Sequence, residues 1–329
     1  MNNEILVSIL SITYNQVKYV KEMLDGFLNQ ETNFGFEILI HDDASTDGTI
    51  DILREYEAKN SCIHIFAEKS NRFGEGINYI NELLLPNAKG KYIAICEGDD
   101  YWCAQDKLQK QVDYMESHPS CSLCTHSAYV ISGNDGLLLG TMGAGSANRS
   151  LNALDLATEW HFPTASFLFK RSDALNYAEK WSFKTPVGDF PRAFYLATVG
   201  DVFFLAEEMS VYRFGAPGSW TSLNIEDERR LIHGGLSWLT MLDNINKVTD
   251  RQFENELIEN GKSKVIRLRG RGNTDFKKSY IGNLAFSSLS IMQRIKYLIL
   301  NLCWTLGFDF QRQAWSGNRQ WRIVRRNSK

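Results

Sequence analysis

The chain has no apolar run long enough to cross a membrane as a helix. Its longest candidate, residues 297–308, is about a dozen residues long, whereas a spanning helix needs about 20. The chain also lacks a Gly-x-Gly-x-x-Gly sequence behind an expected strand, and it lacks a phosphate-binding loop of the Walker type. These absences argue against an integral membrane protein, a nicotinamide-dependent enzyme and a nucleotidyltransferase.

Cysteines are sparse, at six in 329 residues, and the first residues have no basic stretch of the kind that begins a secretory signal. Both features favour a reducing, cytoplasmic setting, which includes the inner face of the cell membrane. The tightest group of zinc-type ligands is His118, Cys121, Cys124 and His126. Because residues 121–131 are expected to form a strand, Cys121 and Cys124 would point to opposite faces, so a zinc site is disfavoured.

The net charge of -3 conceals an uneven distribution. Residues 261–329 hold fifteen Lys and Arg against two acidic residues, a net of +13, which leaves 21 basic and 37 acidic residues in the preceding part, a net of -16. Residues 290–306 place apolar and basic side chains at helical spacing. We therefore expect the tail to contact an anionic membrane, with a contact inside the protein or to another protein as the alternative. Binding to nucleic acid is not expected.

Strands and helices alternate through the first 118 residues, because short β-branched runs are each followed by apolar residues at helical spacing. This pattern predicts a mostly parallel sheet flanked by helices, an α/β fold of Rossmann-like type. We expect a nucleotide-binding half over residues 1–118 and an acceptor half over residues 119–222. A helical region, basic from about residue 261, is expected over residues 223–329.

Three carboxylates crowd the sequence Glu97-Gly98-Asp99-Asp100, directly after the expected strand over residues 91–96. A solvated acidic turn is one interpretation. However, an apolar strand precedes the turn and Tyr101 follows it, which predicts partial burial. Packed carboxylates require a cation, and Mg²⁺ or Mn²⁺ binds through one or two carboxylates together with substrate phosphates.

A second acidic cluster, Asp42 and Asp43, ends the expected strand over residues 36–40. Asp47, a few residues on, has the position of a helix cap. Capping does not explain the two carboxylates at the strand end, where one could accept a ring N–H from a base such as uracil. Ligands of parallel α/β sheets bind beyond the carboxyl ends of the strands, and both acidic clusters fall there.

Other polar residues follow the same strand ends. Thr13, Tyr14 and Asn15 come after the first strand, and Tyr14 has an aromatic face on which a base could stack. Arg72 and Asn78 lie in and after the loop behind the third strand, where they could contact phosphate or ribose. We include all five residues among the candidates for binding a nucleotide sugar.

Taken together, these motifs resemble glycosyltransferase family 2, whose members have the GT-A fold. The resemblance covers about residues 5–215, and its markers appear in the family's order: residues 7–15, 42–49, 90–94, 97–102 and 107–109. It implies transfer of a sugar from a nucleotide-diphosphate donor, with Mn²⁺ or Mg²⁺ and with inversion, as in bacterial polysaccharide biosynthesis. The implied acceptor is a saccharide or a lipid-linked saccharide. A base contact at Asp43 favours UDP or dTDP as the nucleotide of the donor.

The resemblance also implies individual roles. Asp43 would bind the base, Tyr14 would stack near it, and Glu97 would stand on the ribose side. Asp99, with Asp100 beside it, would hold the metal. The family usually has Asp at the position of Glu97, so the longer side chain shifts the expected ribose contact.

The family's catalytic base is an acidic residue after the acceptor-side strand, and Asp189 matches that place. Asp201 is a rival, and a helix cap is the structural alternative for Asp189. Residues 211–221 resemble the family's closing loop, while Trp102 and Trp220 could face a sugar or simply pack. A nucleotide-sugar binding protein without catalytic activity is the alternative function, which the presence of Asp189 disfavours.

Overall fold

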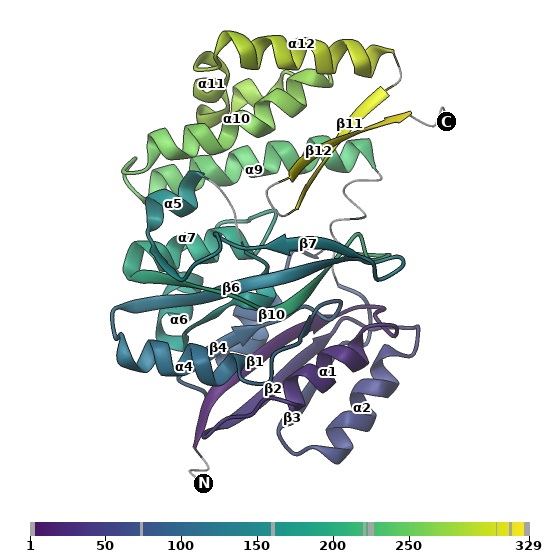
Figure 1. Cartoon of the computed structure of the whole chain (residues 1–329), viewed down its shortest axis with the longest axis vertical. Helices are drawn as coiled ribbons and strands as arrows, with labels where there is room; N and C mark the ends of the chain where they lie inside the picture. The colour runs from purple at the N-terminus through teal and green to yellow at the C-terminus, as the bar shows by residue number, and fades with distance from the viewer. Residues whose placement is uncertain are drawn as a thin grey trace. The chain divides into compact units, whose positions relative to one another are not determined.

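The computed structural model describes residues 4–72, 75–158, 162–219, 222, 227–306, 308–315 and 318–325, the last two ranges as backbone only. The chain divides into two compact units (Figure 1). The first comprises residues up to 153 with 161–182 and 192–219, and the second comprises 154–160, 183–191 and everything from 220 onward.

The first unit is built on one mixed sheet of ten strands. Strands β3, β2, β1 and β4 are parallel neighbours in that order, β9 runs antiparallel between β4 and β6, and β10 lies parallel to β6. The expected α/β class is confirmed, with the parallel part confined to the first half and to the β6–β10 pair. The strands are β1 (Ile5–Thr13), β2 (Gly35–Asp42), β3 (Ile63–Ala67), β4 (Tyr92–Ile95), β5 (Tyr101–Trp102), β6 (Cys121–Ser132), β7 (Leu138–Met142), β8 (Arg149–Leu151), β9 (Leu168–Lys170) and β10 (Asp201–Phe214).

Helices cover both faces of this sheet. On one face, α1 (Val20–Leu28), α2 (Thr49–Lys59) and α4 (Lys107–Ser117) supply the apolar side chains that pack on β1, β2 and β4. A π-helical segment η2 (Ile80–Leu84), α3 (Leu85–Asn87) and α6 (Arg171–Lys180) contact one another away from that cluster, and η2 also contacts β1 and β2. All four residues of β4 are buried, as expected for a strand covered on both sides.

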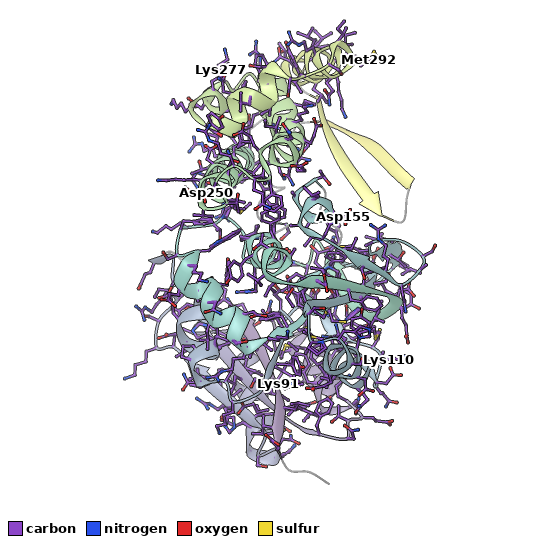
Figure 2. All side chains as sticks on the ribbon, turned by 90° about the vertical axis from the view of Figure 1, so that its left-hand side faces the viewer. Lys91, Lys110, Asp155, Asp250, Lys277 and Met292 are labelled. Carbon is purple, nitrogen blue, oxygen red and sulfur yellow. The ribbon has the colours of Figure 1, made fainter. Side chains whose placement is uncertain are left out.

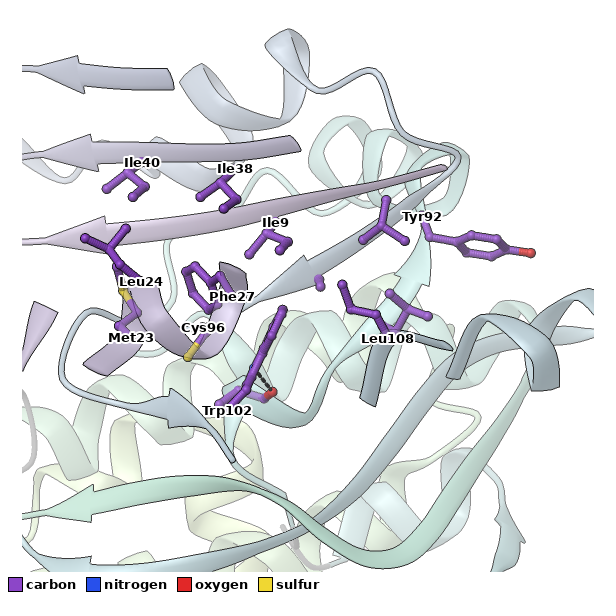
Figure 3. Packing of buried hydrophobic residues seen from close by; sticks show 14 of the residues in the cluster. Ile9, Met23, Leu24, Phe27, Ile38, Ile40, Tyr92, Cys96, Trp102 and Leu108 are labelled. Atoms are coloured by element: carbon purple, nitrogen blue, oxygen red, sulfur yellow. Dashed lines mark hydrogen bonds between the residues drawn. The ribbon is translucent and has the colours of Figure 1, made fainter. Parts of the chain in front are cut away.

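The core forms where the alternating apolar residues of the strands pack against the apolar side of a helix. Alternate strand residues such as Ile9 and Ile38 face α1, whose Leu24 and Phe27 lie on one side of the helix (Figure 3). Gly26 lets α1 approach closely, because a Cβ there would lie 2.6 Å from the backbone oxygen of Trp102. The helix is thereby packed against the segment that follows the acidic turn.

Local contacts shift some expected boundaries. The helical spacing of apolar residues predicts a helix over residues 17–30, but the helix begins at Val20, because the amide of Val17 donates to Asp47 and the amide of Gln16 donates to Thr49. The sequence pattern predicts separate strands over residues 202–205 and 210–214, whereas the structure has the single strand β10, whose register shifts around Glu208. Such irregularities depend on strand pairing, which is not visible along the sequence.

The second unit is mainly helical, which confirms the helical C-terminal region. Helix α10 (Glu254–Gly270) contacts α9 (Glu228–Val248), α11 (Tyr280–Ser287) and α12 (Ile291–Thr305). A two-stranded antiparallel sheet, β11 (Phe308–Trp315) and β12 (Asn318–Arg325), was not expected from the sequence. Among the described residues, no helix combines the length and the apolar character needed to cross a membrane.

Candidate functional site

The two acidic clusters lie on either side of the end of β1. On one side the amide of Asp43 donates to the Thr13 carbonyl at 3.0 Å, and on the other the amide of Gly98 donates to the Ile12 carbonyl at 3.2 Å. Because β2 and β4 both run parallel to β1, their carboxyl ends meet at this edge. The structure thus brings the residues after strands one, two and four together.

Asp42 orders the loop after β2. Its carboxylate accepts from the Ser45 hydroxyl at 2.6 Å, from the Ser45 amide at 2.9 Å and from the Thr13 hydroxyl at 3.0 Å. Asn15, with a left-handed φ of 52°, accepts from the amide of Thr46 at 2.8 Å. Thr13, Asn15 and Asp42 therefore connect the loops after β1 and β2 and fix the position of Asp43.

Asp43 is buried, and its Oδ1 accepts from the Arg72 amide at 2.8 Å. The recorded bonds of the described residues include no donor to its Oδ2. The Arg72 guanidinium is turned to Glu75, 2.7 Å away at the surface. Tyr14, directly after β1, is 47% exposed, so its ring is open to solvent.

A buried histidine lies directly before the Asp42–Asp43 pair. The His41 ring stacks on Tyr79 with centroids 3.6 Å apart, and its Nε2 is 3.7 Å from the Glu68 carboxylate. Burial lowers the pKa of His41, although the nearby carboxylates oppose that shift. The ring is therefore neutral near pH 7, and it supports the Asp43 loop without a positive charge. The sequence does not indicate that His41 and Tyr79 stack on each other.

The acidic turn is only partly open to solvent. Burial raises the pKa of the Asp99 carboxyl, and burial together with the charges of Asp99 and Glu97 raises the pKa of Asp100 well above its usual range. The Asp100 Oδ1 accepts from the Arg213 amide at 2.8 Å, so this side chain is directed toward β10. Glu97 and Asp99 are half-buried and closer to solvent.

Arg213 fixes this turn from the neighbouring strand. Its guanidinium donates to the backbone oxygen of Asp99 and to the carboxylate of Glu22, and it lies 4.9 Å from the ring centre of Tyr19 and 4.6 Å from that of Tyr101. The side chain is only 6% exposed. Its positive charge opposes the burial effect on the pKa of Asp99. The sequence does not indicate these contacts, because the partners of Arg213 lie in distant segments.

The oxygen atoms near the turn suit a divalent cation. A Cβ at Gly98 would lie 2.0 Å from the Gln16 Oε1, and that buried oxygen has no hydrogen-bond partner among the described residues. Among all the residues that the structure describes, no three His, Cys, Asp or Glu side chains converge on a common point. Carboxylates and an amide oxygen without a complete cage match Mg²⁺ or Mn²⁺, which keep positions for water and phosphate.

The family model for glycosyl transferase family 2 matches residues 8–176, just over half of the chain. The chain belongs to this family. An uncharacterised protein of Mycobacterium tuberculosis is 36% identical over 220 residues, which cover 66% of this chain and 61% of that protein. The match thus spans less than two thirds of that relative.

Solved structures show the same GT-A fold at low identity. Residues 1–349 of S. aureus TarS in complex with UDP-GlcNAc superpose with a TM-score of 0.53 at 15% identity, covering 97% of each chain. The mannosyltransferase PcManGT from Pyrobaculum calidifontis, in complex with GDP-Man and Mn²⁺, has a TM-score of 0.52 at 17% identity, covering 92% of this chain and 87% of that one.

Two residues considered in this family context have other contacts. Asn78 accepts through its side chain from the Asn81 amide at 3.2 Å, and its carbonyl accepts from the amides of Asn81 and Glu82, so it belongs to the turn that leads into η2. The indole of Trp102 is buried and donates to the Ala165 carbonyl at 2.9 Å, so it is part of the core and not a sugar platform (Figure 3). Trp220 lies outside the described residues.

Asp189, the expected base, belongs to the second unit and opens α7 (Asp189–Val199). Its Oδ1 accepts from the Phe190 amide at 2.7 Å, and the side chain is half-buried. Asp201 is exposed at the start of β10 in the first unit, where its amide donates to the Ser120 carbonyl at 3.0 Å. Of the two candidates, Asp189 is therefore the more buried.

Proposed function

We propose that this member of glycosyltransferase family 2 transfers a sugar from a nucleotide-diphosphate donor to an acceptor hydroxyl. The observation that carries the proposal is the meeting of the Asp43 loop and the acidic turn at the end of β1. In open α/β sheets this edge is where ligands bind. The acceptor we propose is a saccharide or a lipid-linked saccharide, as in polysaccharide biosynthesis.

Donor binding follows from the loops after β1 and β2. The Asp43 Oδ2 would accept the ring N–H of uracil or thymine, and the exposed Tyr14 ring would stack on the base. Glu97 would reach the ribose. We therefore favour UDP or dTDP donors; the TarS structure cited above holds UDP-GlcNAc, and the PcManGT structure holds GDP-Man.

Mn²⁺ or Mg²⁺ would be held by Asp99, with Asp100 and the Gln16 amide oxygen close by. When bound, the ion supplies positive charge against the charge that develops on the leaving diphosphate. Arg213 keeps the turn in place through its bond to the Asp99 carbonyl. The burial that raises the pKa of both aspartates makes a cation at this turn favourable.

The chemical step we propose is a single displacement. Asp189 takes the proton of the acceptor hydroxyl, and the oxygen forms a bond to the anomeric carbon. The bond from that carbon to the diphosphate oxygen breaks on the opposite face, and the nucleoside diphosphate leaves with the electron pair. Attack from the opposite face inverts the anomeric centre.

The test uses Asp189→Asn with Asp201→Asn as the matched control. Release of nucleoside diphosphate from a panel of UDP- and dTDP-sugars is measured together with thermal shifts on UDP and Mn²⁺. We expect Asp189→Asn to lower release by about 100-fold or more while it keeps the thermal shift, because general bases contribute about 10²- to 10⁴-fold. Normal turnover in Asp189→Asn would remove this residue from the mechanism, and a loss confined to Asp201→Asn would move the role there.

A further inference from the structure

Helix α12 carries its large apolar side chains on the outside of the second unit. Their exposed fractions run from 43% to 77%, whereas a surface helix of a water-soluble domain turns such residues inward. Figure 2 shows Met292 at the outer edge of this unit. The outer face of α12 is formed by Ile291, Met292, Ile295, Leu298, Ile299 and Leu302.

The opposite face of α12 is docked and partly polar. The side chain of Asn301 donates to the Gly270 carbonyl at 3.2 Å, and Leu300 packs at the same glycine. Tyr297 lies 5.7 Å from the guanidinium of Arg269 and contacts Phe286. Helix α12 is therefore held on α10 and α11 by its more polar side. Its more apolar side is exposed, which is the reverse of the usual arrangement of a surface helix.

The charges around this face have one sign. Arg294 and Lys296 lie on α12, and Arg294 also donates to the carbonyls of Ser287 and Leu289, which fixes the start of the helix. No acidic residue occurs between Asp275 and Asp309. The whole segment 261–329 has a net charge of +13.

We propose that the outer face of α12 lies in the interfacial layer of an anionic lipid membrane, with the helix parallel to the surface. Its 15 residues extend about 22 Å, too short to cross a hydrocarbon core of about 30 Å. Exposed apolar residues beside basic ones suit acyl chains under anionic headgroups. Pairing of this face with the same face of a second copy fits less well, because it would bring two sets of basic residues together without an acidic partner.

Flotation of the full chain with vesicles tests the proposal, using phosphatidylcholine alone and phosphatidylcholine with about 30% phosphatidylglycerol. We expect binding to the anionic vesicles that weakens with salt. Leu298→Asp/Leu302→Asp should lower it at least tenfold. The matched control is Leu137→Asp/Leu138→Asp, two leucines of similar exposure on the β6–β7 hairpin, which should leave flotation unchanged.

Lys296→Gln should weaken binding to anionic vesicles about fivefold and leave binding to neutral vesicles unchanged, because each basic residue near such a surface contributes about 1 kcal/mol. Circular dichroism and the thermal shift on UDP and Mn²⁺ show that each variant is folded. Equal flotation of the Leu298/Leu302 variant overturns the proposal. Sedimentation overturns it too if the native chain is a dimer that this variant dissociates and the native chain does not bind vesicles. The face would then bind a second copy.

Discussion

Arg213→Met tests whether the acidic turn depends on a single buried guanidinium. The substitution keeps an unbranched side chain but removes the donors to the Asp99 carbonyl and the Glu22 carboxylate. It also removes the positive charge between the rings of Tyr19 and Tyr101. Because Arg213 is 6% exposed, water does not replace these contacts.

The cost follows from the individual contacts. A hydrogen bond with a charged partner contributes about 1.5–3 kcal/mol, and a desolvated cation–π contact contributes about 0.5–2 kcal/mol. The bond to the exposed Glu22 contributes less than about 1 kcal/mol. We expect Arg213→Met to lower the free energy of unfolding by about 3–5 kcal/mol in urea titrations. Arg54→Met, which breaks an exposed pair with Glu57 at 2.6 Å, should cost less than about 1 kcal/mol.

The same variant should weaken Mn²⁺-dependent UDP binding at least tenfold, measured by isothermal titration calorimetry at a temperature where it remains folded. The reason is geometric, since Arg213 holds the backbone of Asp99. The reasoning is refuted if Arg213→Met costs no more stability than Arg54→Met, or if the variant binds UDP and Mn²⁺ with unchanged affinity.

Three further predictions concern neighbouring residues. Gly98→Ala should weaken UDP–Mn²⁺ binding in calorimetry because its Cβ would lie 2.0 Å from the Gln16 Oε1 and 2.7 Å from the Thr13 Cγ2; unchanged binding would show that the turn accommodates the extra methyl group. Burial lowers the pKa of Lys107 to about 7, whereas an unfolded lysine keeps about 10.4. The unfolded chain therefore binds more protons between these values, so the free energy of unfolding should rise from about pH 7 to 10, and urea titrations of Lys107→Met should lack this part of the slope. Tyr14→Ala should leave the melting temperature unchanged and weaken UDP binding about 5- to 50-fold, as expected for a stacking ring and not for a core residue.

Much of the first unit is predictable from its sequence because its signals are local. The helix over residues 49–59 occupies those positions in the structure, and the apolar runs of β1 and β2 lie within one or two residues of their expected bounds. The polar clusters after the strands are predictable as neighbours, since parallel strands align their carboxyl ends. These features depend on periodicity and strand direction alone.

The hydrogen-bond partners of the individual site residues are not predictable in the same way. Asp42 and Asp43 are adjacent and chemically alike, yet the hydroxyls of Ser45 and Thr13 donate to the first, while the second accepts from the backbone amide of Arg72. The partners of Arg213 lie 114 and 191 residues away along the chain. Contacts over such separations follow from the packed sheet, and no local pattern encodes them.

Calorimetric titration of UDP with and without Mn²⁺, on the native chain and on Asp99→Asn, tests the central claim most directly. Asp106→Asn is the matched control, because Asp106 pairs with Lys110 at the surface seven residues farther along the chain. The account predicts that Mn²⁺ tightens UDP binding at least tenfold in the native and Asp106→Asn chains and has no effect on Asp99→Asn. UDP affinity that ignores Mn²⁺ in the native chain, or a full Mn²⁺ effect in Asp99→Asn, would contradict it.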